Sequence, residues 1–375
     1  MTINLNLIIL VLILNIFSCP EKQSPLEEQQ IEKKNSDYKI EPFVRNLEVP
    51  WSIVFTSPDR ILVTERPGRL RVVENGNLNS KPLSEFSDVS SGSEEGLMGL
   101  ALDPDYENNK LIYLSYAYND GDLNVKVVRF KDIGTNLSDE KVIFDGIPAA
   151  RFHAGCRLKF GPDKKLYITT GDAGDRKFAQ DLDKLHGKIL RINSDGSIPN
   201  DNPFPNSPVW TYGHRNPQGI DWYPGTDILW ETEHGPSGFD GPGGGDEVNV
   251  IVKGKNYGWP IVSHNDNKEG LVAPVFVFTP AEAPASGMFY KSGKIAGWKN
   301  NFFFGCLRGN GIIRVIVDEK DLSKGLSYEK FATTYGRIRD ITEGPDGYIY
   351  FSSSNLDGRG NPKDGDDKIY RITLQ

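Results

Sequence analysis

Short apolar runs recur along the chain, and each follows a turn built from Gly, Pro, Asp or Asn. Few segments carry the 3.6-residue apolar period of an amphipathic helix, so the runs predict β-strands. The predicted strands include Ile61–Glu65, Leu111–Leu114, Leu166–Asp172, Ile228–Glu233, Tyr348–Phe351 and the more degenerate Asn301–Gly305.

A second run that contains a basic residue often follows the first. These second runs are Arg69–Val73, Lys188–Ile192, Ile312–Val315 and Lys368–Ile372. Short strands in units of about 40 to 60 residues are typical of a β-propeller, and six copies predict six blades. We therefore expect an all-β chain in which residues 40–375 form one six-bladed β-propeller; two β-sandwiches are the alternative arrangement.

The N-terminal residues predict a targeting sequence. Leu5–Phe17 is almost wholly apolar and is followed by Ser18 and Cys19, so residues 1–19 are predicted to be a signal peptide. Ile16–Cys19 resembles a bacterial lipobox, which predicts lipidation of Cys19 and location in the periplasm or cell envelope; a plain secretion signal is the alternative. Residues 20–39 are rich in Glu, Gln, Lys and Ser and are expected to form a flexible tether.

Charge and composition exclude several classes of partner and site. The chain holds 43 Lys and Arg against 51 Asp and Glu, and this net charge of −8 argues against nucleic acid as the main partner. No later apolar run is long enough to span a bilayer, so membrane contact is expected only through the lipid anchor. Three cysteines are too few for a disulfide scaffold, and Cys156 and Cys306 are expected to be free thiols, with a bridge as the alternative.

Five polar clusters lie beside the predicted strands. One holds His153, whose imidazole can accept a proton near neutral pH, although a structural histidine is the alternative. A second places Arg215 and Asn216 on a loop. In a third, Gly235-Pro236 precedes the glycine-rich loop 237–245, where free carbonyl oxygens would suit a hard cation such as calcium; a surface loop is the alternative.

The remaining two clusters are basic. Arg308, Arg337 and Arg339, together with Arg215, could form a cationic pocket in an otherwise acidic protein. Guanidinium groups bind carboxylates in bidentate fashion, so the pocket would suit a ligand with several carboxylates. Individual surface salt bridges are the alternative reading of each arginine.

Seven motifs together resemble the soluble, pyrroloquinoline-quinone (PQQ)-dependent glucose/sorbosone dehydrogenase family, and especially its aldose sugar dehydrogenase branch. The resemblance covers residues 42–373. The motifs are Leu47–Trp51, Glu95–Asp105, His153–Arg157, Gly187–Arg191, Gly213–Gly219, Asn256–Pro260 and Arg337–Asp340.

The resemblance implies a six-bladed propeller that holds PQQ over its channel, with a calcium ion that touches the quinone. His153 would be the general base, and Arg215, the second catalytic residue, would polarise the quinone carbonyl together with calcium. The implied cofactor-binding residues are Arg157, Arg215, Asn216, Arg308, Arg337 and Arg339. Calcium would bind the carbonyls of Gly235 and Pro236, with a further site in some relatives at Glu247 and the Tyr257 carbonyl. Two departures are Phe278, where relatives often have a Trp, and Glu94, where some have a Gln.

The implied reaction is oxidation of an aldose at C1 to a lactone, with hydride transfer to the quinone and electrons passed to an external quinone or cytochrome. Two other functions compete with it. A calcium-dependent lactonase or other hydrolase would need a metal site lined by carboxylates. A non-catalytic propeller that binds sugar or protein would have no need of the His153 and arginine set.

Overall fold

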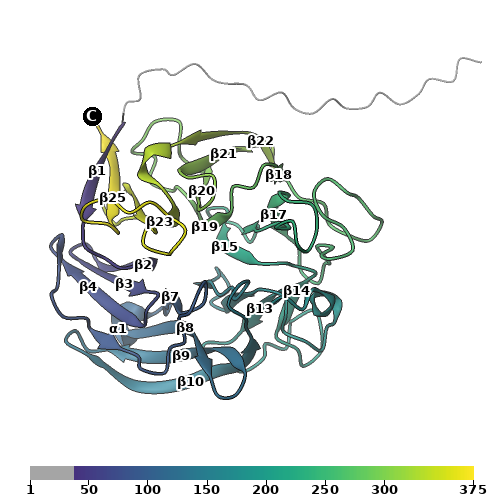
Figure 1. Ribbon diagram of the computed structural model, residues 1–375, viewed down its shortest axis with the longest axis horizontal. Coiled ribbons are helices and arrows are strands. Elements are labelled where there is room, and N and C mark those ends of the chain that lie inside the picture. The colour runs from purple at the N-terminus through teal and green to yellow at the C-terminus, as the bar shows by residue number, and fades with distance from the viewer. Residues whose placement is uncertain (1–37) are drawn as a thin grey trace, which may run out of the picture. The chain divides into compact units, whose positions relative to one another are not determined.

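The computed structural model describes residues 38–375, which form an almost entirely β-stranded ring (Figure 1). The predicted signal peptide, Cys19 and nearly all of the predicted tether lie outside the described residues. Within residues 38–375, no helix is both long and apolar enough to cross a membrane. The helical segments are α1 (Tyr106–Asn109) and the 3₁₀ turns η1 (Arg176–Gln180) and η2 (Thr333–Tyr335).

Six antiparallel sheets form the ring, which confirms the predicted six-bladed propeller. Blade 1 holds β2 (Pro50–Ser57), β3 (Arg60–Glu65), β4 (Arg69–Glu74) and β5 (Asn77–Leu78), with β6 (Ser84–Glu85) paired to β4. Blade 2 holds β7 (Leu97–Leu102), β8 (Leu111–Asn119), β9 (Leu123–Asp132) and β10 (Leu137–Pro148). Blade 3 holds β11 (Leu158–Phe160), β12 (Leu166–Thr170), β13 (Lys188–Ile192) and β14 (Val209–Tyr212).

The other half of the ring follows the same plan. Blade 4 holds β15 (Pro217–Trp222), β16 (Leu229–Glu233), β17 (Asp246–Ile251) and β18 (Phe276–Phe278). Blade 5 holds β19 (Pro284–Phe289), β20 (Phe302–Cys306), β21 (Ile312–Asp318) and β22 (Asp321–Phe331). Blade 6 holds β23 (Ile338–Glu343), β24 (Ile349–Ser353), β25 (Ile369–Leu374) and, on its outer edge, β1 (Tyr38–Val44).

The first strand of each blade is the inner one. β2 contacts β7 and β23, and β19 contacts β15 and β23, so inner strands of neighbouring blades meet around the channel. The six recurring runs of the sequence are the second strands of the blades, namely β3, β8, β12, β16, β20 and β24. The runs with a basic residue are third strands, namely β4, β13, β21 and β25.

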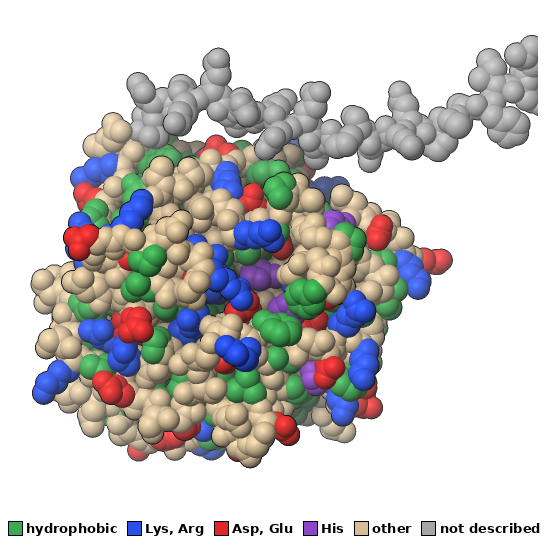
Figure 2. Space-filling model, viewed as in Figure 1, with side chains coloured by type: hydrophobic (Ala, Val, Ile, Leu, Met, Phe, Trp, Pro, Cys, Tyr) green, Lys and Arg blue, Asp and Glu red, His purple; other side chains and the backbone are tan. Residues whose placement is uncertain are grey.

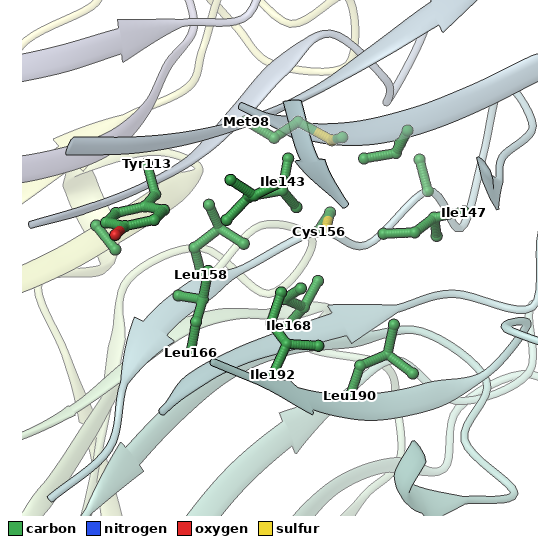
Figure 3. Close-up of a cluster of buried hydrophobic side chains, with 14 of the residues drawn as sticks. Met98, Tyr113, Ile143, Ile147, Cys156, Leu158, Leu166, Ile168, Leu190 and Ile192 are labelled. Atoms are coloured by element: carbon green, nitrogen blue, oxygen red, sulfur yellow. The ribbon is translucent and has the colours of Figure 1, made fainter. Parts of the chain in front are cut away.

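Each central strand buries both of its faces, which explains why the runs are nearly continuously apolar. On β12, Leu166 and Ile168 join the cluster between blades 2 and 3, whereas Tyr167 joins the cluster on the side of blade 4. Figure 3 shows the first of these clusters, where Met98 and Ile147 of blade 2 lie with Leu158, Ile192 and neighbouring side chains of blade 3. Neighbouring blades are therefore joined by interdigitated apolar side chains.

The two ends of the ring are joined in blade 6. β1 pairs antiparallel with β25, with register from Tyr38 opposite Leu374 to Val44 opposite Ile369. Backbone bonds from Asn46 N to the Gly365 oxygen and from Leu47 N to the Asp367 oxygen, each 3.0 Å, continue this contact. β1 thus covers the edge of β25 that would otherwise be unpaired.

We predict that loss of β1 destabilises the whole ring. A chain that starts at Arg45 should melt about 5 °C or more below a chain that starts at Tyr38, because β25 loses its partner strand and blade 6 its covalent link to blade 1. Thermal unfolding followed by circular dichroism measures the difference. Equal melting temperatures would show that the β1–β25 pairing does not hold the ring closed.

Candidate active site

A cavity of about 620 Å³ opens at one end of the central channel. In an antiparallel blade, the start of the inner strand and the end of the second strand lie at the same edge, so the segments there converge on this mouth. Around the central hollow, Figure 2 shows Lys and Arg side chains gathered with His side chains. The predicted site residues that line the cavity are His153, Arg215, Asn216, Gly235, Pro236, Arg308, Arg337 and Arg339.

His153 precedes β11 and has an oriented imidazole. Its Nδ1 lies 2.7 Å from Oδ1 of Asp172, and both side chains are buried. The other oxygen of Asp172 accepts a 2.8 Å hydrogen bond from the Trp259 indole. A carboxylate only accepts, so Nδ1 carries the proton and Nε2 is left with a lone pair to act as a base.

Asp172 is a residue that the motif analysis did not assign to the site. It lies two residues after Thr170, the last residue of β12, which is one of the recurring second strands. The segment immediately after a second strand lies at the mouth, as Gly235 does after β16, and a polar residue at that position is the signal that could have identified Asp172.

Glu94 also lies in the cavity wall, in the segment before β7. One of its oxygens accepts from the His153 backbone N–H at 3.1 Å, and the other pairs with Arg359 at 2.7 Å. Burial acts to raise the pKa of Glu94, but the electrostatic interaction with His234 and the ion pair and hydrogen bond with Arg359 prevail and lower it to about 2. Glu94 is therefore an anion that fixes the backbone of the proposed base.

The arginines of the cavity differ in how well they are paired. Arg215 binds Asp240 at 2.7 Å, and Arg337 binds Asp357 at 2.7 Å. Within the described chain, Arg339 has no carboxylate partner; its contact is a long 3.4 Å bond to Gln218, and its buried Nε has no partner. Burial lowers the pKa of Arg339 to about 9, so it is a buried cation at neutral pH.

Unpaired donors make the cavity suitable for a ligand with several carboxylates. Besides the Nε of Arg339, the buried Nδ2 of Asn216 has no partner, and Arg308 is exposed at the wall. Buried donors left without acceptors are costly, and a polyanionic ligand would satisfy them. The residues present therefore fit a cofactor such as PQQ.

The acidic groups fit a hydrolytic metal site poorly. Among the described residues that line the cavity, only Glu94 and Asp246 carry carboxylates. Asp246 already accepts from the backbone N–H groups of Gly235, Glu282 and Ala283, each at 2.7 Å. Two carboxylates that are already hydrogen-bonded within the protein are a poor match for the carboxylate-lined metal site that a lactonase needs.

Arg157 occupies a different place from that expected, because it does not line the cavity. Its guanidinium lies 4.1 Å from the centre of the Trp51 ring and binds Asp340 at 3.0 Å and Ser52 at 2.8 Å. Trp51 does line the cavity, so Arg157 supports the wall rather than touching its contents. Its ion pair with Asp340 on β23 holds the side chain there.

Gly235 and Pro236 bring backbone carbonyls to the cavity. A side chain at Gly235 would lie 2.2 Å from the Gly245 oxygen and 2.3 Å from the Gly244 oxygen, so glycine is required there. The Pro236 oxygen accepts from Gly244 N at 3.2 Å and keeps a second lone pair. Such carbonyls are suitable ligands for calcium.

Glu247 and Tyr257 line a smaller adjacent cavity, together with Gly235 and Pro236. Glu247 lies opposite Glu233 in the sheet, and Glu231 projects from the same face of β16 as Glu233. Burial, and then the Glu233 charge, raise the pKa of both Glu231 and Glu247. Glu231 and Glu233 are buried and Glu247 is partly buried. The three carboxylates fit a hard divalent cation, and the alternate glutamates of β16 were the signal for the two that sequence reasoning missed.

Two other expectations concern residues near the site, namely the two cysteines and Phe278. Cys156 and Cys306 are buried and unpaired, which confirms the prediction of free thiols. Burial raises the pKa of Cys156 to about 12, so this thiol is unreactive. Phe278 packs against Phe304 in the core of blades 4 and 5 and does not line the cavity, so it cannot replace a Trp there.

Most of the chain is similar to known proteins. Residues 47–369 match the model of the Glucose / Sorbosone dehydrogenase family. The aldose sugar dehydrogenase of Escherichia coli K12 is 35% identical, over 85% of this chain and 91% of that protein.

Two solved structures are also similar. One from Thermus thermophilus, described as a "putative oxidoreductase (glucose dehydrogenase)", is 38% identical with a TM-score of 0.83, over 90% of this chain and 100% of that one. The PQQ-bound aldose sugar dehydrogenase of Streptomyces coelicolor is 30% identical with a TM-score of 0.79, over 90% of this chain and 98% of that one.

We predict that Arg339 lowers the stability of the empty protein. Arg339→Met should raise the free energy of unfolding at pH 7 by about 1 kcal/mol or more, because it removes a buried charge that has no carboxylate partner. The folded-state pKa is lowered to about 9, so this cost is fully present below pH 9 and disappears as the pH rises toward the usual range of arginine. Chemical denaturation without ligand measures it.

Arg337→Met is the matched control, because Arg337 is paired with Asp357. Its loss should lower stability by leaving that carboxylate unpaired. If Arg339→Met is destabilised as much as Arg337→Met, then Arg339 is not an uncompensated charge.

Proposed function

The chain belongs to the glucose/sorbosone dehydrogenase family, and on that premise we propose that it is a PQQ-dependent enzyme that oxidises aldose sugars at C1 to lactones. The observation that carries the proposal is the joint presence of an oriented base, His153 held by Asp172, and a buried arginine, Arg339, whose Nε has no hydrogen-bond partner. A sugar-binding module would have no need of the first, and a hydrolase would have no need of the second.

PQQ would be held by the cationic side of the cavity. Arg308, Arg337 and Arg339 would bind its three carboxylates, and the free Nδ2 of Asn216 and the guanidinium of Arg215 would donate to its oxygens. Arg157 would act indirectly, through Trp51 and Asp340. When bound, PQQ together with calcium supplies an electrophilic carbonyl that accepts a hydride from C1 of the sugar.

Calcium would be held by backbone carbonyls at the cavity. Gly235 and Pro236 line both cavities, which supports a role for their carbonyls as ligands of an ion beside the cofactor. Glu247 and the Tyr257 carbonyl would hold a second, structural calcium in the adjacent small cavity, which Glu233 also lines. These assignments follow from the chemistry of the donors, since calcium prefers carboxylate and carbonyl oxygens.

His153 would remove the proton of the anomeric hydroxyl. Its Nε2 is the acceptor, because Nδ1 donates to Asp172. The imidazolium that forms would be stabilised by the Asp172 carboxylate, which the Trp259 indole holds in place. Glu94 fixes the backbone of the base through its bond to His153 N.

The reaction would take place outside the cytoplasm. Reduced cofactor must pass two electrons to an external acceptor, for which a quinone or a cytochrome is suitable. The signal peptide and the Cys19 lipid anchor that the sequence predicts would place the enzyme in the bacterial periplasm or cell envelope.

Reconstitution of the purified protein tests the proposal. Dye-linked oxidation of aldoses should require both added PQQ and calcium, and His153→Ala should lower kcat by about 10²–10⁴-fold because a general base is lost. The variant should still bind PQQ, which separates loss of the base from loss of the cofactor.

His186→Ala is the matched control, since His186 is also a largely buried histidine but does not line the cavity. It should retain the wild-type rate. Absence of any aldose oxidation in the fully loaded wild-type protein would contradict the proposed function.

A further inference from the structure

Phe239 is the most exposed of the large hydrophobic side chains in the described chain, with 72% of its surface accessible. It lies in the glycine-rich segment between β16 and β17, three residues after Pro236 of the cavity wall. A single exposed apolar residue is ordinary on most surfaces. Phe239 is different because of what lies beside it.

Two aromatic rings flank the proposed base. The Phe239 ring lies nearly parallel to the His153 imidazole, with centroids 6.4 Å apart and an interplanar angle of 18°. The Phe152 ring is perpendicular to both, 4.9 Å from His153 and 6.0 Å from Phe239. Neither phenyl ring lines the cavity itself, so the pair forms an apolar wall at its rim, on the side of His153.

The wall is fixed to the site rather than carried on a free loop. Asp240, next to Phe239, binds the guanidinium of Arg215 at 2.7 Å and accepts from Ser237 N at 2.9 Å. Its backbone oxygen accepts from Arg176 at 2.7 Å, and Ser237 Oγ accepts from Arg215 at 3.0 Å. The same arginine that faces the cavity therefore sets the position of Phe239.

A sugar has a surface that matches this wall. The axial C–H groups of a pyranose form an apolar face, and burying such a face against an aromatic ring is favourable, whereas its hydroxyls need the polar groups of a cavity. Apart from Trp51, which is almost fully buried, the described residues that line the cavity include no aromatic carbocycle. Phe239 and Phe152 supply the apolar contact that the cavity lacks.

We propose that Phe239 and Phe152 form the apolar side of the substrate subsite, against which the C–H face of a pyranose packs while its anomeric hydroxyl lies at His153. This inference rests on the proposed function, because it takes an aldose as the substrate. Phe239 is a binding and specificity residue in this arrangement, and it has no part in proton transfer.

Steady-state kinetics of the PQQ- and calcium-loaded enzyme test it with the best substrate among D-glucose, D-galactose, D-xylose and maltose. Phe239→Ala should raise KM about five- to tenfold, with kcat changed less than about threefold, because stacking is lost and the base is intact. Phe239→Trp should restore a KM close to that of the wild type. The control is Leu326→Ala on β22, another exposed hydrophobic residue, which should leave both constants unchanged.

A binding measurement complements the kinetics. Saturation-transfer NMR, with irradiation of aromatic protons under anaerobic conditions and no electron acceptor, should show transfer to the C–H protons of the sugar that falls in Phe239→Ala and persists in Phe239→Trp. Circular dichroism of each variant verifies the fold.

Three results would overturn the inference. If KM and saturation transfer are unchanged in Phe239→Ala while the wild type oxidises aldoses, the wall does not bind sugar, and the proposed function stands. If kcat falls and KM does not, Phe239 acts by positioning His153 instead. If the loaded wild type oxidises no aldose, the proposed function fails and the subsite with it.

Discussion

Closure of the ring is the constraint on which the site depends. His153 comes from the segment before blade 3, Arg215 from the segment before blade 4, Arg308 from blade 5 and Arg339 from blade 6. These blades are joined by connecting loops, by apolar interfaces and by polar contacts such as Ile341 N to Ser286 Oγ between blades 6 and 5 and the Arg157–Asp340 ion pair. The distances between the side chains are therefore set by how the blades pack around the channel. The pairing of β1 with β25 fixes that packing, because it ties the first strand of the described chain into the last blade. A propeller can therefore build one polar cavity from residues that are far apart in sequence, from Trp51 to Lys363.

Some polar side chains at the cavity already have hydrogen-bond partners within the protein, whereas others do not. Asp172, Glu94 and Asp240 have their hydrogen bonds made within the protein, and they orient His153 and Arg215 before any ligand arrives. Arg339 and the Nδ2 of Asn216 are buried without partners, which costs folding free energy. Such a cost is expected where a binding site is prepared for an anionic ligand, since the ligand then supplies the missing acceptors. The oriented groups surround the proposed base, and the unpaired groups are those proposed to bind the cofactor.

Much of this could be predicted from sequence, for reasons that are local. The turn-and-strand pattern located the second strand of every blade, because a strand buried on both faces must be apolar along its length. His153 and the arginines could be identified because their motifs lie next to those strands. The roles of Asp172 and Glu94 could not be predicted, since those roles depend on contacts with His153 from other segments. Arg157 lies beneath Trp51 because its side chain pairs with Asp340, a contact across 183 positions that spacing does not reveal. The position of Phe239 likewise depends on the bond between Asp240 and Arg215.

Calorimetric titration of PQQ into the purified protein, at low and at high salt, tests whether the cationic side of the cavity binds a polycarboxylate. We expect saturable binding with one PQQ per chain, and an affinity about tenfold or more weaker when the salt concentration rises from about 0.05 to 0.5 M, because charged contacts are screened. Absence of saturable binding, or binding that does not respond to salt, would contradict this expectation.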